Sequence, residues 1–217
     1  MGTPKLFRYG SVEVEHLRSK DARLGAAIDR IGEIERPVDD DLFSSVIHHI
    51  IGQQISGKAQ RTVWSRMCAA MGDVTPEAVA RADVSALQSF GMTWRKAGHI
   101  KAFAEDVRSG AFDLAAVERM SDDEAIAALT SLRGVGTWTA EMILLFCLGR
   151  PDVLSFGDLG IRRGMRMVYR HWEIDRERFE RYRRRLSPYG SVASLYFWAV
   201  AGGAIPELTD PASKHGR

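Results

Sequence analysis

The sequence predicts an all-α protein, and three observations support this fold class. Apolar residues recur at three- and four-residue spacing along most of the 217 residues, which is typical of amphipathic helices. Glycine and proline separate the periodic segments, as at Pro37, Gly72 and Gly110. Strand-like alternation occurs only as a weak sign near residues 9–14. We therefore expect about eight to eleven helices and no sheet.

The expected helices follow one another along the whole chain. In order, they cover residues 12–31, 42–71, 84–87, 99–107, 122–132, 137–148, 159–169, 176–186 and 192–200. Four side chains that can accept a backbone N–H mark expected helix starts: Asp40, Thr75, Ser121 and Ser187. The polar tail from Pro206 onward is expected to fray.

Two segments are apolar on all sides: MILLFCL at residues 142–148 and SLYFWAV at residues 194–200. Helices of this kind run through the interior of a protein rather than along its surface. We therefore expect both segments in the core.

The composition argues against several classes of site. Cys68 and Cys147 are the only cysteines, so we expect no disulfide framework, zinc site or four-cysteine iron–sulfur cluster. The six histidines lack metal-ligand spacing, so we expect no cofactor and no catalytic metal. The longest apolar run is too short to cross a membrane, and the N-terminus lacks the apolar core of a secretory signal. These patterns predict a cytoplasmic protein without a membrane partner.

Positive charge gathers in one segment although the formal net charge is only +2. Residues 161–185 contain ten arginines and four acidic residues. A phosphate-contacting surface would explain this excess. A solvated helix face with pairs such as Glu177–Arg181 would explain it equally well.

The stretch LRGVGTWTA, residues 132–140, places Gly134 and Gly136 between two expected helices. Glycine permits the positive φ angles of a tight reversal, so a helix–helix turn with a glycine cap is one interpretation. The other is an anion site, because a helix start offers free N–H groups and the glycines let a phosphate approach the backbone. Such a hairpin would hold a nucleic-acid backbone without reading its sequence.

Asp158 lies twenty-two residues beyond Gly136, in the segment SFGDLGIRRGM. It can serve as the N-cap of the helix over residues 159–169. A carboxylate at this position can also take part in chemistry on a nucleic acid, and the two roles are compatible.

Four segments carry a family resemblance: HHIIGQQISGKAQ at residues 48–60, FGMTWRKAGHI at residues 90–100, LRGVGTWTAEM at residues 132–142 and DVLSFGDLGIRRGM at residues 152–165. In this order they resemble the helix-hairpin-helix superfamily of DNA glycosylases, and within it the 3-methyladenine DNA glycosylase II type. The resemblance covers roughly residues 40–203. It implies two helical subdomains, residues 41–151 with the hairpin and residues 1–40 with 152–217, and an active-site cleft between them.

The resemblance also implies roles for particular residues. Asp158 falls on the catalytic aspartate, and Gln53 and Gln54 fall in the loop that fills the gap left by a flipped nucleotide. The base pocket would be lined by Trp138, Trp198, Met142 and Leu159, the last two standing where some relatives have tyrosines. Residues implied to bind DNA are Arg133, Gly134, Val135, Gly136, Thr137, Thr139, Arg162 and Arg163. The hairpin carbonyls of such proteins often hold a monovalent cation.

The implied function is monofunctional base excision. In bifunctional relatives a lysine nucleophile stands where this chain has Trp138. We therefore expect a monomer that removes alkylated purines from damaged duplex DNA without cutting the strand, in the nucleoid if the organism is bacterial. Two alternatives remain: a glycosylase for a neutral lesion (hypoxanthine, ethenoadenine or uracil), and a non-catalytic DNA-binding module in which Asp158 is only a cap.

Overall fold

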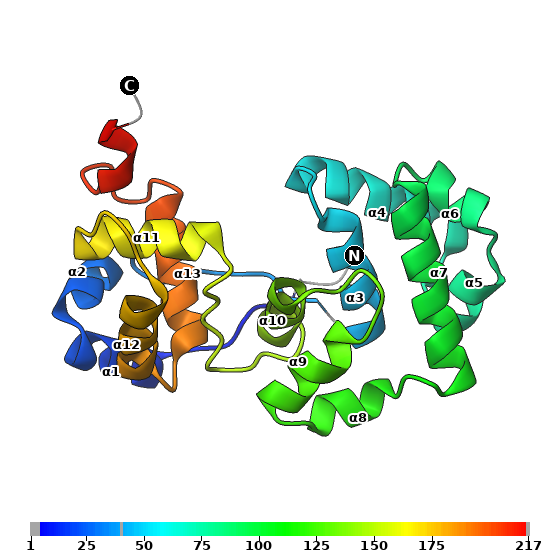
Figure 1. Ribbon diagram of the computed structural model, residues 1–217, viewed down its shortest axis with the longest axis horizontal. Coiled ribbons are helices and arrows are strands. Elements are labelled where there is room, and N and C mark those ends of the chain that lie inside the picture. The colour runs from blue at the N-terminus through cyan, green and yellow to red at the C-terminus, as the bar shows by residue number, and fades with distance from the viewer. Residues whose placement is uncertain (1–4, 40, 216–217) are drawn as a thin grey trace. The chain divides into compact units, whose positions relative to one another are not determined.

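The computed structural model describes residues 5–39 and 41–215 and divides the chain into two units (Figure 1). Unit 1 comprises Met1–Val38 and Gly149–Arg217, and unit 2 comprises Asp39–Leu148. Within the described residues the regular structure is helical, and the one isolated β-bridge pairs Leu6 with Pro37. The all-α prediction is therefore confirmed.

The described residues form thirteen α-helices, more than the number expected. One reason is that two expected helices are interrupted. Asp21 ends α1 (Ser11–Lys20) and caps α2 (Ala22–Ile31), because its carboxylate accepts the N–H groups of Arg23 and Leu24. Residues 53–56, which we name the Gln loop, separate α3 (Leu42–Gly52) from α4 (Gly57–Met71).

Other helices are too short for periodicity to reveal. They are α5 (Pro76–Arg81) and α8 (Leu114–Arg119), each of six residues. The strand-like alternation near residues 9–14 does not correspond to a strand, because α1 begins at Ser11. Thr75 and Ser121 cap α5 and α9 (Asp122–Thr130) as predicted.

Two of the other predicted starts need separate comment. Asp40 lies outside the described residues, and Asp41 caps α3 by accepting the Ser44 N–H. Ser187 is wrong as a helix start, because it ends α12 (Arg176–Leu186). Its hydroxyl instead donates to the Asp152 carboxylate.

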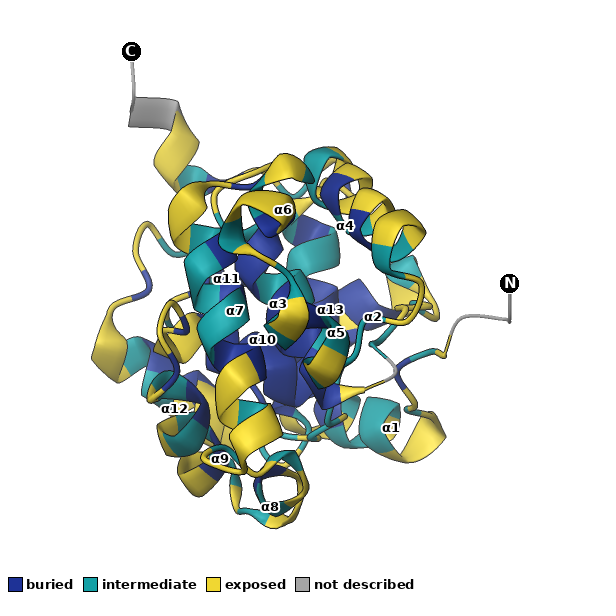
Figure 2. Ribbon diagram, turned by 90° about the vertical axis from the view of Figure 1, so that its right-hand side faces the viewer, coloured by how far each residue is buried: buried dark blue, intermediate teal, exposed yellow. Residues whose placement is uncertain are grey.

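Unit 2 is built around α3 and α10 (Thr137–Phe146), both drawn largely in the buried colour in Figure 2. α10 packs against α3 and α9, whereas α5 and α6 (Val84–Ser89) pack against α7 (Trp94–Ser109). Phe43 of α3 stacks on Phe103 of α7 with ring centroids 5.2 Å apart. The predicted core segment MILLFCL thus begins within the buried helix α10.

Unit 1 is built around α13 (Gly190–Ala201), which packs against α11 (Leu159–Tyr169) and α2. Nine of the twelve residues of α13 are buried. A Cβ atom at Gly164 would overlap the carbonyl group of Phe197, so α11 and α13 cross with their backbones in contact. This close crossing positions the start of α11.

The expected fraying of the tail was wrong as far as His215. Pro211–His215 form a short 3₁₀ helix, and Arg166 of α11 donates two hydrogen bonds, of 2.9 and 2.6 Å, to the buried Asp210 carboxylate. A bidentate charged pair of this kind holds the polar segment against α11. Across the described part of the chain, every helix is too short or too polar to span a bilayer.

Candidate functional site

Asp158 is a buried carboxylate at the start of α11 in unit 1. It is only 7% exposed, and its Oδ1 accepts the Ile161 N–H at 2.8 Å. The N-cap interpretation is therefore confirmed. The same Oδ1 accepts the indole N–H of Trp198 at 3.0 Å. Two donors from different helices thus orient one carboxylate.

Gly160 allows this arrangement. A Cβ atom at Gly160 would lie 2.8 Å from Cδ1 of Trp198 and 3.1 Å from Oδ1 of Asp158. The indole can therefore lie over the first turn of α11 only because residue 160 lacks a side chain. This role of Gly160 was not predicted from the sequence. The available signal was that Gly160 and Gly164 stand four residues apart on one helix face, a spacing that signals close helix packing.

The hairpin joins α9 and α10 in unit 2. Leu132 and Val135 are buried and anchor it, whereas Arg133, Gly136 and Thr137 are exposed. Gly134 has a φ of 84°, and a Cβ atom there would overlap the imidazole of His99. Gly136 is the N-cap of α10 and has no side chain to occupy the helix start, with open space where its Cβ would stand. The start of α10 therefore has no side-chain cap from residue 136.

The two glutamines of the Gln loop have different surroundings. The Gln53 amide donates to the Gly134 carbonyl at 2.8 Å and lies 3.4 Å from the Thr139 hydroxyl. Gln54 is exposed and has a φ of 57°, which is uncommon for a residue with a side chain. Thr139 is 4% exposed, so the Gln53 amide approaches a hydroxyl that is largely buried. Gln53 therefore ties the loop to the hairpin, whereas Gln54 projects from it.

Lys96 of α7 also holds the Gln loop, a role that sequence reasoning missed. Its ammonium donates to the carbonyls of Ile51 and Gln53 at 2.8 and 2.6 Å. Burial lowers the pKa of the Lys96 ammonium, and Arg95 lowers it further. The available signal was the segment FGMTWRKAGHI, in which Lys96 and His99 lie near the start of α7. Lys96 contacts the Gln loop, and His99 lies beside Gly134 of the hairpin.

The remaining pocket candidates differ in exposure. Trp138 is 43% exposed in the first turn of α10, and Leu159 is 73% exposed in the first turn of α11. Met142 is buried in α10. Leu159 and Trp138 therefore present apolar surface, whereas Met142 contributes to packing.

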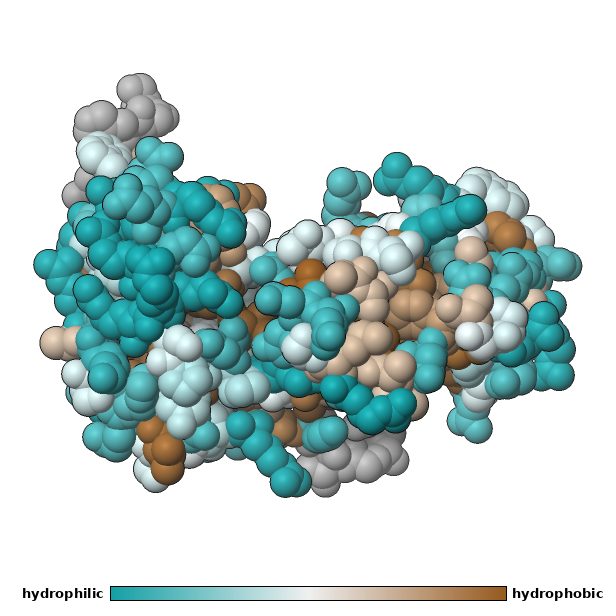
Figure 3. Space-filling view, turned by 60° about the horizontal axis from the view of Figure 1, so that its bottom comes forward, coloured by the Kyte–Doolittle hydropathy of each residue, from teal (hydrophilic) through white to brown (hydrophobic). Residues whose placement is uncertain are grey.

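Acidic residues neutralise part of the arginine-rich segment. Arg185 donates to Asp21 at 3.0 Å, and Arg166 and Arg163 approach Asp210. Arg176 and Arg178 lie within ion-pair distance of acids on α12 or at its cap. Figure 3 shows hydrophilic side chains gathered over unit 1. The interpretation as a solvated, ion-paired face therefore accounts for half of the ten arginines.

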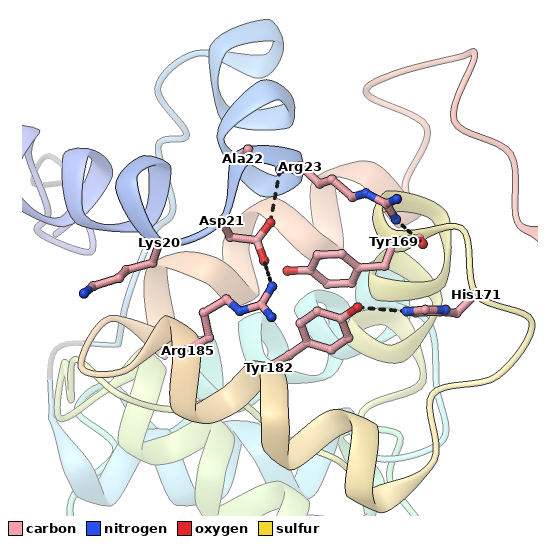
Figure 4. Close-up of a pocket in the computed structure, with 8 residues that line it drawn as sticks. All are labelled: Lys20, Asp21, Ala22, Arg23, Tyr169, His171, Tyr182 and Arg185. Atoms are coloured by element: carbon pink, nitrogen blue, oxygen red, sulfur yellow. Dashed lines mark hydrogen bonds and ion pairs between the residues drawn. The ribbon is translucent and has the colours of Figure 1, made fainter.

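Some arginines of the segment also contact aromatic rings. The Arg162 guanidinium lies 5.0 Å from the Phe156 ring centroid. A cavity of about 450 Å³ in unit 1 is lined by Tyr169 and Tyr182, whose rings stack 3.9 Å apart (Figure 4). The Arg185 guanidinium lies 5.3 Å from the Tyr182 ring centroid, and Arg23 donates to the Tyr169 carbonyl. These cation–π contacts contribute to the packing of unit 1.

The described residues contain no cluster of three or more metal-ligating His, Cys, Asp or Glu side chains. Cys68 and Cys147 are both free thiols.

Comparison with known proteins places this geometry in a family. Residues 47–188 match the model of the HhH-GPD superfamily of base excision DNA repair proteins. This match covers more than half of the sequence and includes the Gln loop, the hairpin and Asp158. The chain belongs to this superfamily.

Particular relatives share most of the chain. It is 35% identical to a DNA-3-methyladenine glycosidase from Bacillus halodurans, with a TM-score of 0.82 over 94% of this chain and 95% of the other. A DNA-3-methyladenine glycosylase of Schizosaccharomyces pombe is 30% identical over 174 residues, 78% of this chain and 75% of that protein. A 3-methyladenine DNA glycosylase of the same yeast in complex with abasic DNA is 26% identical, with a TM-score of 0.79 over 88% and 97% of the two chains.

Proposed function

We propose that the protein is a DNA glycosylase that hydrolyses the N-glycosidic bond of alkylated purines such as 3-methyladenine in duplex DNA. The observation that carries this proposal is the Asp158 carboxylate, buried and oriented by the N–H groups of Ile161 and Trp198. The names of the relatives support the substrate class. The protein would act as a monomer in the compartment that holds the chromosome.

Asp158 would stabilise positive charge on the sugar as the base departs. The transition state of glycosidic hydrolysis resembles an oxocarbenium ion. At about 4 Å and an effective dielectric constant of about 20, opposite unit charges attract by roughly 4 kcal/mol. This energy corresponds to a rate factor of about a thousand.

Alkylation of the base would supply the rest of the rate enhancement. An N-alkylated purine is cationic and leaves without protonation by a general acid. Trp198, whose indole already lies beside Asp158, would stack on this electron-poor base with a cation–π attraction of about 0.5–2 kcal/mol. The exposed Trp138 is proposed as a second aromatic surface for the base.

Trp138 and two lysines of unit 2 support hydrolysis without strand cleavage. Trp138 stands where bifunctional relatives have a nucleophile. Lys96 is engaged by two carbonyls of α3 and the Gln loop, and Lys101 donates to the carbonyls of Ala80 and Ala82. Both ammonium groups are thus held by backbone carbonyls, which favours hydrolysis over attack by an amine.

An assay on two duplexes tests the proposal. Wild-type protein should release free 3-methyladenine from methylated duplex DNA and leave an intact strand with an abasic site. With a preformed abasic duplex and borohydride, we expect no covalent protein–DNA adduct. A trapped adduct or a β-elimination product would refute the monofunctional assignment.

A further inference from the structure

The exposed face of α4 forms a continuous cationic surface in unit 2. Its residues are Lys58, Arg61, Thr62, Ser65, Arg66 and Ala69, which line one open groove and which we name the α4 face. Successive members lie three, one, three, one and three residues apart, so all six share one side of the helix. Val63 and Met67 are buried on the opposite side.

No carboxylate neutralises this surface within the described residues. The helix sequence GKAQRTVWSRMCAAM contains neither Asp nor Glu. Across residues 5–39 and 41–215, Lys58, Arg61 and Arg66 pair with no acidic side chain, and Arg66 donates only a 3.4 Å hydrogen bond to the Phe90 carbonyl. The arginine-rich segment differs, because five of its guanidinium groups lie near carboxylates. The α4 face therefore keeps its full charge for a partner.

The α4 face continues directly from the Gln loop. Ser56 of the loop caps α4 by accepting the Ala59 N–H. Gln60 of α4 donates to the His48 carbonyl at 2.9 Å and fills the space beside Gly52, where a Cβ atom would come within 2.5 Å of its amide. The first two turns of α4 are thus braced against α3, next to the loop that Gln53 ties to the hairpin.

We propose that the α4 face binds backbone phosphates of the duplex DNA held by the hairpin. The proposal rests on the proposed function in that DNA is the partner. Lys58 and Arg66 are separated by about 12 Å along the helix axis. Phosphates of one strand recur every 3.4 Å along the duplex axis, so the three cations can serve up to three phosphates of a strand. The hydroxyl groups of Thr62 and Ser65 offer further donors to phosphate oxygens.

Salt-dependent binding to an undamaged duplex tests the α4 face. The variant carries Lys58→Gln, Arg61→Gln and Arg66→Gln. Each phosphate contact contributes about 0.9 to the slope of log K against log salt, so the slope should become shallower by up to about 2.7. The same relation gives a loss in affinity of roughly five- to tenfold per charge at 0.1 M salt.

A matched variant controls for net charge. Arg81→Gln, Arg108→Gln and Arg119→Gln remove three exposed cations from the last turns of α5, α7 and α8. The slope of log K against log salt for this variant should differ from the wild-type slope by less than about 0.9, the contribution of one phosphate contact. A second control, Arg61→Lys with Arg66→Lys, preserves the charge and should also keep the wild-type slope. This control separates a loss of electrostatic contacts from misfolding.

A wild-type slope in the α4 variant, or an equal loss in the control variant, overturns the inference. Excision is measured separately on methylated duplex. If the wild-type protein binds through α4 but releases no base, the proposed function is refuted and the inference about the α4 face still holds. If the α4 variant excises at the wild-type rate and binds DNA as the wild type does, only the inference about the α4 face is refuted.

Discussion

At the residue scale, the side chain of Trp198 serves two purposes. Its ring is an aromatic surface, and its N–H donates to Asp158 at 3.0 Å. Trp198→Phe keeps an aromatic ring, although a smaller one, and removes the donor. A hydrogen bond to a charged group contributes about 1.5–3 kcal/mol, so we expect the single-turnover excision rate to fall at least about tenfold.

The control for this variant is the exposed Trp172 of unit 1. Trp172→Phe should leave the excision rate unchanged. If Trp198→Phe excises at the wild-type rate, the indole N–H does not position Asp158. A fall in rate with unchanged affinity for duplex DNA separates positioning from base stacking.

The two glutamines of the Gln loop should respond differently to substitution. Gln54→Ala should slow excision without lowering the melting temperature, because Gln54 is exposed. Gln53→Ala should also lower the free energy of unfolding by about 0.5–1.5 kcal/mol, since it removes the bond to the Gly134 carbonyl. Equal effects of both changes on stability and excision would contradict these separate roles.

At the element scale, the crossing of α11 and α13 depends on two glycines. A Cβ at position 164 meets the Phe197 backbone, which cannot move aside, so Gly164→Ala should destabilise the protein by at least about 1–3 kcal/mol. A Cβ at position 160 meets the Trp198 side chain, which can rotate. Gly160→Ala should therefore displace the indole from Asp158 and reduce excision more than stability.

Urea unfolding and single-turnover excision measure these two effects. Gly98→Ala on α7 is the control, because nothing lies within 4 Å of the position that an added Cβ would take. The change should be neutral or stabilising by up to about 1 kcal/mol. If Gly164→Ala is as stable as the wild type, the backbones of α11 and α13 are not in close contact.

Periodicity predicted most helices but missed the points where they break. A three- and four-residue pattern continues across Asp21, whose carboxylate caps a new helix, and across Gln54, whose φ is positive. The motif segments indicated Asp158 and the hairpin. The Asp158–Trp198 and Lys96–Gln53 contacts join residues at least forty positions apart, and local sequence carries no information about them.

At the scale of the whole molecule, we expect two partly buried histidines to make stability depend on pH. Burial lowers the pKa of His49 below its ordinary value, despite a hydrogen bond with the Ser45 carbonyl and the nearby Asp39 charge, and His48 lowers it further. The unfolded chain then binds more protons below a pH of about 6.5. Stability is therefore retained above this pH and falls as the pH drops below it.

Chemical denaturation between pH 5 and pH 8 measures this dependence. His49→Gln should flatten the slope below a pH of about 6.5, because the titrating group is removed. The pKa of His171 in unit 1 is also lowered by burial, so His171→Gln should remove a separate part of the slope. An unchanged slope in both variants would assign the acid sensitivity to other groups.

The most direct measurement compares wild-type protein with Asp158→Asn on duplex DNA that contains 3-methyladenine. Asparagine caps a helix as well as aspartate and can accept the Trp198 N–H, so the fold should be preserved while the charge is lost. We predict that wild-type protein releases the base, and that the variant binds the duplex with equal affinity but excises at least about a thousandfold more slowly. Excision by the folded variant at the wild-type rate would contradict the assignment of Asp158 as the catalytic carboxylate.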